Sequence, residues 1–155
     1  MKAIEIQAPN KLEDDDRVKI FLAGSIEMGK AEDWQKKVVD ALADYPIQFL
    51  NPRRDDWDSS LEQTIENKQF KEQVTWELDG LEASNFIILY FDKDTKSPIS
   101  LLELGLHACC NPEKLVVLCP EGFWRKGNVD IVCDKYDVIQ VKNFDELIEL
   151  FKTDK

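Results

Sequence analysis

The residue with the clearest chemical potential is Glu103, the one acid in the leucine-rich residues 101–106. A carboxylate among leucines is poorly solvated, yet one or two turns from a helix N-terminus it faces the positive end of the helix dipole. Such opposing influences suit a carboxylate to acid–base or nucleophilic chemistry. A structural explanation stays open beside this one, because Ser100 and Glu103 also fit a capping box that would only close the first turn.

Two further acids lie near the end of a long predicted helix. Glu77 and Asp79 are two residues apart, so they face different directions. Glu77 lies beside the apolar stripe and reaches the ligand end of a sheet only if the helix bends toward it. Asp79 is expected on the solvated face. His107 shares a face with Glu103, but two ligands do not make a metal site, and a packed or hydrogen-bonded histidine is the better expectation.

Residues 24–31, Gly-Ser-Ile-Glu-Met-Gly-Lys-Ala, match the phosphate-binding pattern GxxxxGK[ST] except at the last position. Ala31 offers no hydroxyl to a metal, and Glu27 would place a negative charge inside the phosphate cradle. Nucleoside triphosphate hydrolysis is therefore a minor alternative. It predicts magnesium-dependent ATP binding that fails in Lys30→Ala.

A second polar loop, residues 51–58, combines two arginines, acids and a tryptophan. Arginines beside an aromatic ring could orient a ribose, stack on a base or bind a phosphate. An exposed, salt-bridged turn is at least as common. Trp57 favours a binding role, because large aromatic side chains seldom lie in water without a partner.

Along the chain, short apolar runs alternate with longer segments in which apolar residues recur at helical spacing. Strands are predicted at 18–23, 47–50, 86–91, 115–119 and 137–141, and helices at 30–45, from 61 to 81, after Ser97 and at 144–151, with a short helix or loop at 123–130. This alternation indicates a parallel sheet with helices on both faces. We predict an α/β, flavodoxin-like three-layer sandwich with a five-stranded sheet in the order 2-1-3-4-5, and an additional edge strand at 3–6 stays open.

In such a sheet, ligands bind beyond the carboxyl ends of the strands, where the strand order reverses between the first and third strands. This rule selects the loops at 24–29, 51–58 and 92–97, in which polar and aromatic residues are concentrated. The coincidence predicts a small-molecule site there.

The bulk composition limits the classes of partner. A net charge of -11 argues against a nucleic-acid polymer. No apolar run approaches the ~20 residues of a membrane helix, and the N-terminus does not resemble a signal peptide. The cysteines form no CxxC pair, so we expect neither zinc nor disulfides, and no other cofactor. The prediction is one cytoplasmic domain over residues 1–155, with 1–16 as a loosely held lead-in.

Several pieces of the chain resemble, in order, nucleoside 2-deoxyribosyltransferase-like proteins. They are residues 21–26 (FLAGSI), 51–53 (NPR), 76–77 (WE), 84–88 (SNFII) and 97–105 (SPISLLELG). The resemblance covers about residues 18–128. Its most specific piece is the pattern Ser-x-x-x-x-x-Glu-x-Gly formed by Ser97, Glu103 and Gly105.

The resemblance implies roles for both acids. In that family the glutamate at the position of Glu103 attacks C1′ of a 2′-deoxynucleoside, releases the base and carries the sugar as a covalent ester. The family's second acid is an aspartate eight residues before an Ala-Asp pair. Here the pair is Ser84-Asn85 and the count gives Glu77, with Asp79 less well aligned. The predicted substrate-binding residues are Phe21, Gly24, Ser25, Ile26, Asn51, Pro52, Arg53, Asp56, Trp57, Trp76, Asp92, Ser97 and Asn128.

The resemblance also implies assembly. The family completes each site with a polar residue from a neighbouring subunit, about 25 positions after the glutamate, where this chain has Asn128. A homo-oligomer that binds a nucleoside or nucleotide is therefore expected.

The predicted activity is transfer of deoxyribose between bases. Members that hydrolyse deoxynucleoside monophosphates carry a serine at the position of Ser97, whereas transferases acting on unphosphorylated nucleosides tend to have aspartate there. Hydrolysis of a deoxynucleotide by an N-glycosidase is thus the first alternative, and a nucleotide-binding or sensing module without turnover is the second.

Overall fold

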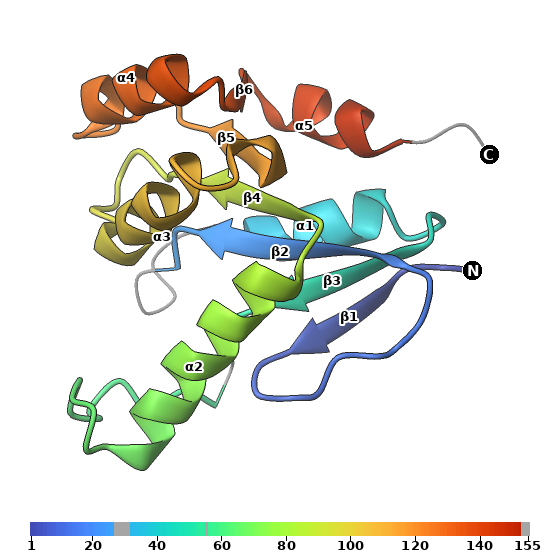
Figure 1. Cartoon of the computed structure of the whole chain (residues 1–155), viewed down its shortest axis with the longest axis vertical. Helices are drawn as coiled ribbons and strands as arrows, with labels where there is room; N and C mark the ends of the chain where they lie inside the picture. The colour runs from blue at the N-terminus through green and yellow to red at the C-terminus, as the bar shows by residue number, and fades with distance from the viewer. Residues whose placement is uncertain (27–31, 55, 153–155) are drawn as a thin grey trace.

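A single parallel sheet organises the protein (Figure 1). The structure, a computed structural model, describes residues 1–26, 32–54 and 56–152. Within this part of the chain the sheet has six strands in the order β1-β3-β2-β4-β5-β6, and every neighbouring pair is parallel. The strands are β1 (Ile4–Gln7), β2 (Val18–Gly24), β3 (Ile47–Asn51), β4 (Phe86–Tyr90), β5 (Leu115–Leu118) and β6 (Ile139–Val141).

Helices cover both faces of the sheet, which gives three layers. The helices are α1 (Trp34–Ala41), α2 (Lys68–Ala83), α3 (Pro98–Ala108), α4 (Lys126–Tyr136) and α5 (Phe144–Phe151), with a short 3-10 helix η2 (Pro112–Lys114) before β5. One apolar cluster joins α2, α3 and α4 to the sheet, and a second joins α1 and α5 to the opposite face. Residues 20–23 of β2, residues 87–90 of β4 and all of β5 are buried, which explains the apolar sequences of these segments.

The three-layer parallel architecture is confirmed, but the prediction of five strands is wrong. The five predicted strands keep their predicted relative order, and β1 adds a sixth at the edge by pairing with β3 from Ile4 opposite Gln48 to Gln7 opposite Asn51. The signal of β1 is weak because it is four residues long and its two isoleucines are only half-buried. A strand of this kind is stabilised by its pairing rather than by its own hydrophobicity.

The region before β6 also differs from the expectation. A short helix or loop was expected at 123–130, whereas α4 continues to Tyr136 and ends at Asp137, which has a left-handed φ of 56°. Val129 and Cys133 form its buried side, but Ile131 is 70% exposed. An exposed isoleucine in the middle of the helix hides the helical period in the sequence.

The strand order reverses between β2 and β4, and the loops after these strands are joined there. The Ser25 amide donates to the Tyr90 carbonyl oxygen at 2.8 Å, and the indole of Trp34 donates to the Ser25 carbonyl oxygen at 3.1 Å. The start of α1 is thereby fixed to the carboxyl edge of the sheet. Across the described residues, no helix combines the length and the apolar character that crossing a membrane requires.

Candidate active site

Glu103 lies inside α3 rather than at its beginning. The helix starts at Pro98 with Ser97 as its N-cap, so the capping-box explanation of Glu103 is wrong. Glu103 is only 8% exposed. Ser100, Glu103 and His107 form a buried polar row on this helix. A carboxyl charge at a buried position is costly, which marks Glu103 as a functional candidate.

The packing of α2 brings Glu77 toward Glu103. A Cβ added at Gly80 would lie 2.8 Å from the ring of Phe21, so the glycine permits a close approach of α2 to β2. The ring of Trp76 packs on Phe21 with 5.9 Å between the centroids. Glu77 lies one turn before Gly80 and is half-buried, and its charge contributes to the raised pKa of Glu103. Gly80 thus lets α2 pack closely on β2 one turn after Glu77.

The pKa values of the Glu103 and Glu77 carboxyls are both strongly raised. Burial, with a smaller contribution from the charge of Glu77, raises the pKa of Glu103 to about 8. Burial also raises the pKa of Glu77 to about 7, while hydrogen-bonding by the Gln73 side chain lowers it. Since neighbouring carboxyls titrate together, these values belong to the pair. Between them the pair holds about one proton, an arrangement suited to acid–base chemistry near neutral pH.

The other two titratable candidates are Asp79 and His107. Asp79 is exposed on α2. His107 is buried on α3, and its Nδ1 lies 3.3 Å from the amide oxygen of Asn111. The expected packed, hydrogen-bonded histidine is thus what the structure contains.

Three hydroxyl groups meet beside the amino end of α3. Ser25 Oγ lies 3.0 Å from Thr95 Oγ1, and Ser97 Oγ is hydrogen-bonded to Ser25 Oγ and lies 2.7 Å from Thr95 Oγ1. The Asp92 amide donates to Ser25 Oγ at 2.7 Å. The cluster joins the ends of β2 and β4 to α3. Ser97 has a left-handed backbone with φ of 47°, so the chain turns sharply into the helix that carries Glu103.

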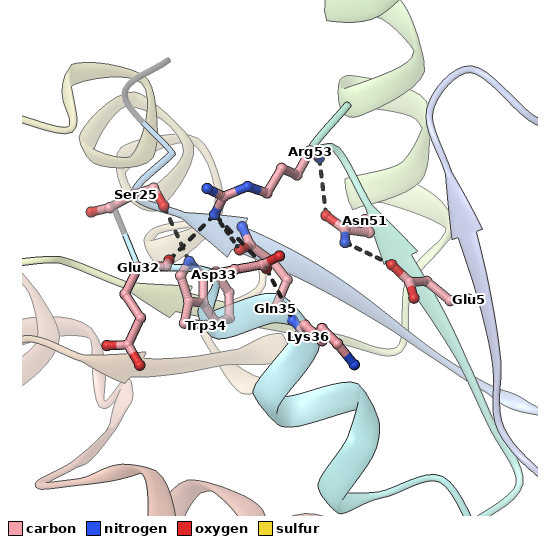
Figure 2. A network of polar contacts seen from close by, with 9 residues as sticks. All are labelled: Glu5, Ser25, Glu32, Asp33, Trp34, Gln35, Lys36, Asn51 and Arg53. Carbon is pink, nitrogen blue, oxygen red and sulfur yellow. Dashed lines mark hydrogen bonds and ion pairs between the residues drawn. The ribbon is translucent and has the colours of Figure 1, made fainter. Parts of the chain in front are cut away.

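Arg53 links the end of β3 to the start of α1 (Figure 2). Its Nη1 donates to the Glu32 carbonyl oxygen and to Gln35 Oε1, each at 3.3 Å, and lies 3.8 Å from Asp33 Oδ1. Asn51 accepts from the Arg53 amide at 2.9 Å and donates to Glu5 at 2.8 Å. Both predicted residues therefore have structural partners at the carboxyl edge of the sheet.

Arg54 organises the other half of the same loop. Its guanidinium lies 3.1 Å from Asp56 Oδ1, donates to Gln73 Oε1 at 3.3 Å, and is stacked over Trp57 at 5.5 Å. Hydrogen bonding to Arg54 lowers the pKa of Asp56. The expected partner of Trp57 is thus Arg54, so the cation–π contact alone accounts for this tryptophan.

The remaining predicted substrate-binding residues lie on several different elements. Phe21 and Pro52 are buried, Ile26 and Asp92 are half-buried, and Asn128 is exposed on α4. Trp76 is half-buried and donates its indole N–H to the Asn10 carbonyl oxygen at 2.8 Å. Within the phosphate-loop pattern, residues 27–31 lie outside the described residues.

Sequence reasoning missed Gln73 and Thr95, both buried polar residues that contact the site. The position of Gln73 four residues before Glu77 is the one available signal, because residues at that spacing share a helix face. In the described part of the chain, no three His, Cys, Asp or Glu side chains are grouped so that they could hold a metal ion.

Comparisons with known proteins identify the family of the chain and a shared fold. The chain matches the family described as nucleoside 2-deoxyribosyltransferase like over residues 17–123. No curated protein matches it. Among solved structures it is similar to the crystal structure of a conserved protein from Enterococcus faecalis V583, with a TM-score of 0.58 and 15% identity over 86% of this chain and 96% of that one. That identity supports the shared fold alone. Because the family match spans well over half of its length, the chain belongs to the nucleoside 2-deoxyribosyltransferase-like family.

Proposed function

We propose that the protein cleaves the N-glycosidic bond of a 2′-deoxynucleoside and transfers the deoxyribosyl group to another base. The observation that carries this proposal is the pair formed by the buried Glu103 and the half-buried Glu77, which hold about one proton near neutral pH. Displacement at an anomeric carbon passes through an oxocarbenium-like state, which a neighbouring carboxylate stabilises before it bonds to the carbon. A second carboxyl supplies the proton that the departing base needs.

In the first step, a carboxylate oxygen of Glu103 bonds to C1′ as the bond from C1′ to the base nitrogen breaks. The electron pair leaves with the base, which takes the proton of Glu77. In the second step an acceptor base attacks C1′, returns a proton to Glu77 and frees the Glu103 carboxylate. Glu77 is favoured over Asp79 as the second acid because Asp79 is exposed, whereas the charge of Glu77 acts on Glu103.

The experiment that tests this proposal is mass spectrometry of the intact protein after mixing with deoxynucleosides. We expect an added mass of one deoxyribosyl group, which peptide mapping places on Glu103 and which a second free base removes. Unmodified protein together with bound, unaltered nucleoside in both wild type and Glu103→Ala would instead support a binding module without turnover.

The pH dependence of the reaction follows from the pair. The reaction needs one carboxyl ionised and the other protonated, so it is suppressed below about 7, where both hold protons, and above about 8, where both are ionised. We therefore expect a bell-shaped profile of kcat/KM for base exchange, measured by chromatography of the free bases. A profile that stays flat from acid to alkaline pH would contradict this assignment.

Hydrolysis of a deoxynucleoside monophosphate is the second candidate, and the hydroxyl cluster favours it. Ser25, Thr95 and Ser97 gather at the amino end of α3, where hydroxyl groups and the helix dipole suit a phosphate. The products distinguish the two reactions. A transferase forms a new nucleoside when a second base is present, whereas a hydrolase releases the free sugar whether or not that base is added.

We also propose that the protein is a homo-oligomer, with Asn128 of one subunit completing the site of another. Ile99, Leu102 and Leu106 form an apolar row on the outside of α3, and each is between 46% and 59% exposed. The row follows helical spacing and lies on the helix that carries Glu103. Sedimentation equilibrium tests the assembly, and a monomer at all concentrations would contradict it.

A further inference from the structure

Gln35 is a buried amide at the start of α1, and the proposed reaction gives it no role. The residue is fully buried, and its Nε2 has no hydrogen-bond acceptor among the residues that the structure describes. A buried donor without an acceptor is costly, and folded proteins keep few such groups. The unused donor of Gln35 therefore indicates an acceptor that a ligand supplies.

The orientation of the Gln35 amide is set by Arg53 (Figure 2). Arg53 Nη1 donates to Gln35 Oε1 at 3.3 Å. The reversed amide would turn its NH₂ group toward the guanidinium, so that two donors would face one another. Oε1 is thus the atom already in use, and Nε2 is the donor that is left over.

Gln35 lies near the point where the strand order of the sheet reverses. The residue before it, Trp34, donates its indole N–H to the Ser25 carbonyl oxygen at 3.1 Å. Ser25 Oγ is in turn hydrogen-bonded to Ser97 Oγ at the start of α3, the helix that carries Glu103. Ligands of open parallel sheets bind at such a reversal, beyond the carboxyl ends of the strands. The unused donor on α1 and the carboxyl on α3 therefore belong to two helices that begin at the same expected binding site.

Arg53 lies over the end of the Gln35 side chain, and its own side chain is 16% exposed (Figure 2). Its contacts with Gln35 Oε1 and with the Glu32 carbonyl oxygen are both 3.3 Å, which is long for hydrogen bonds of this type. A small movement of the guanidinium costs little in these two bonds. Such a movement gives a ligand atom access to Nε2 from the carboxyl edge of the sheet.

The charges around Gln35 favour an uncharged acceptor over an anion. Asp33 Oδ1 lies 3.8 Å from Arg53 Nη1, so a carboxylate already balances the guanidinium. Glu5 accepts a hydrogen bond from Asn51 and adds a second carboxylate to this edge. A phosphate is better served by the hydroxyl cluster at the amino end of α3. The group that fits at Gln35 is a neutral oxygen, such as the carbonyl oxygen of a nucleobase.

We propose that Gln35 Nε2 donates a hydrogen bond to a carbonyl oxygen of the substrate base and makes the protein selective for oxo bases over amino bases. This inference rests on the proposed function, which places a nucleoside at this edge with its sugar at Glu103. An amino group at the same position of the base is a donor, so it would face the Gln35 NH₂ group without an acceptor between them. Oxopurines and oxopyrimidines supply the same acceptor.

The experiment compares deoxynucleosides that differ in one group, deoxyinosine with deoxyadenosine and deoxyuridine with deoxycytidine. Calorimetry on the full chain in the Glu103→Gln background keeps the nucleosides intact. We expect the oxo member of at least one pair to bind about tenfold more tightly, the value of one hydrogen bond. Gln35→Leu, of similar volume, should bring that ratio to about one, because the donor is lost. Gln35→Glu keeps an acceptor for Arg53 but replaces the donor by a second acceptor, so it should reverse the ratio.

The matched control is Gln69→Leu at an exposed position of α2, which should leave the ratio unchanged. Equal binding within both pairs, or binding of none of these nucleosides, would overturn the inference. A preference that survives in both Gln35→Leu and Gln35→Glu would overturn it as well, and base exchange by the wild type would then leave the proposed reaction standing. A preference that depends on Gln35, in a protein whose wild type exchanges no bases, would support the inference and contradict the reaction.

Discussion

Glu103→Gln is expected to abolish deoxyribosyl transfer and at the same time to stabilise the folded protein at alkaline pH. Glutamine keeps the shape of the side chain but cannot form the ester, so we expect a loss of at least about 1,000-fold in kcat/KM. The gain in stability has a separate cause. The wild-type carboxyl lies at a buried position where its charge is desolvated, whereas glutamine carries no charge to desolvate.

The sign of the stability change follows from the raised pKa. The folded protein holds the Glu103 proton up to about pH 8, while the unfolded chain releases it near 4.5. Unfolding therefore becomes more favourable as the pH rises through this window and levels off above it. The wild type should lose on the order of 4 kcal/mol between these limits, and Glu103→Gln should not. At pH 5 the two proteins should be nearly equally stable.

Thermal unfolding at pH 5 and at pH 8.5 measures this effect, with Glu82→Gln as the matched control at an exposed position on α2. The difference in Tm between variant and wild type should grow by roughly 10 °C from the lower to the higher pH only for Glu103→Gln. An equal difference at both pH values would show that the carboxyl is well solvated. Retained transfer activity would remove Glu103 from the role of nucleophile.

The sequence predicts the central sheet well because buried parallel strands are continuous apolar runs. β4, β5 and residues 20–23 of β2 are of this kind, and the alternation with helices indicates a parallel sheet. β1 is less visible because an edge strand depends on its neighbour β3 for stability. In α4 the exposed side chain of Ile131 conceals the helical period. The differences thus occur where tertiary contacts outweigh local pattern.

In the candidate site, too, the local sequence predicts some features, whereas tertiary packing determines the others. Burial of Glu103 follows from its leucine neighbours, but the effect of Glu77 on it depends on how α2 packs on the sheet, where Gly80 permits a close approach to Phe21. Spacing alone leaves Glu77 and Asp79 as alternatives, because the side of a helix that faces a neighbouring helix is a tertiary property. The contacts between Arg54 and Gln73 join residues 19 positions apart, so no local pattern reveals them.

Gly24→Ala is expected to cause the largest loss of stability among single substitutions at the site. Gly24 ends β2 with a φ of +140°, a conformation that L side chains rarely adopt. An added Cβ would lie 2.4 Å from the carbonyl oxygen and 2.8 Å from the nitrogen of Tyr90, both backbone atoms of the adjacent strand β4. Backbone atoms in a paired strand cannot move aside cheaply, so strand separation is required.

We expect this substitution to reduce the free energy of unfolding by about 3 kcal/mol or more and to lower Tm by roughly 6 °C or more. Gly127→Ala is the matched control, because a Cβ at this exposed position of α4 meets nothing within 4 Å. There alanine should stabilise the helix by up to about 1 kcal/mol. Chemical denaturation of both variants checks the pair, and equal stability would show that β2 and β4 adjust freely.

The outcome also bears on how the first loop is understood. The separation of β2 from β4 would pull Ser25 away from the Tyr90 carbonyl oxygen and from the hydroxyl cluster at α3, so activity should fall together with stability. The requirement for glycine at position 24 then comes from the contact between two strands. A phosphate bound by the loop is not needed to account for Gly24, so this glycine does not favour a nucleoside triphosphate site.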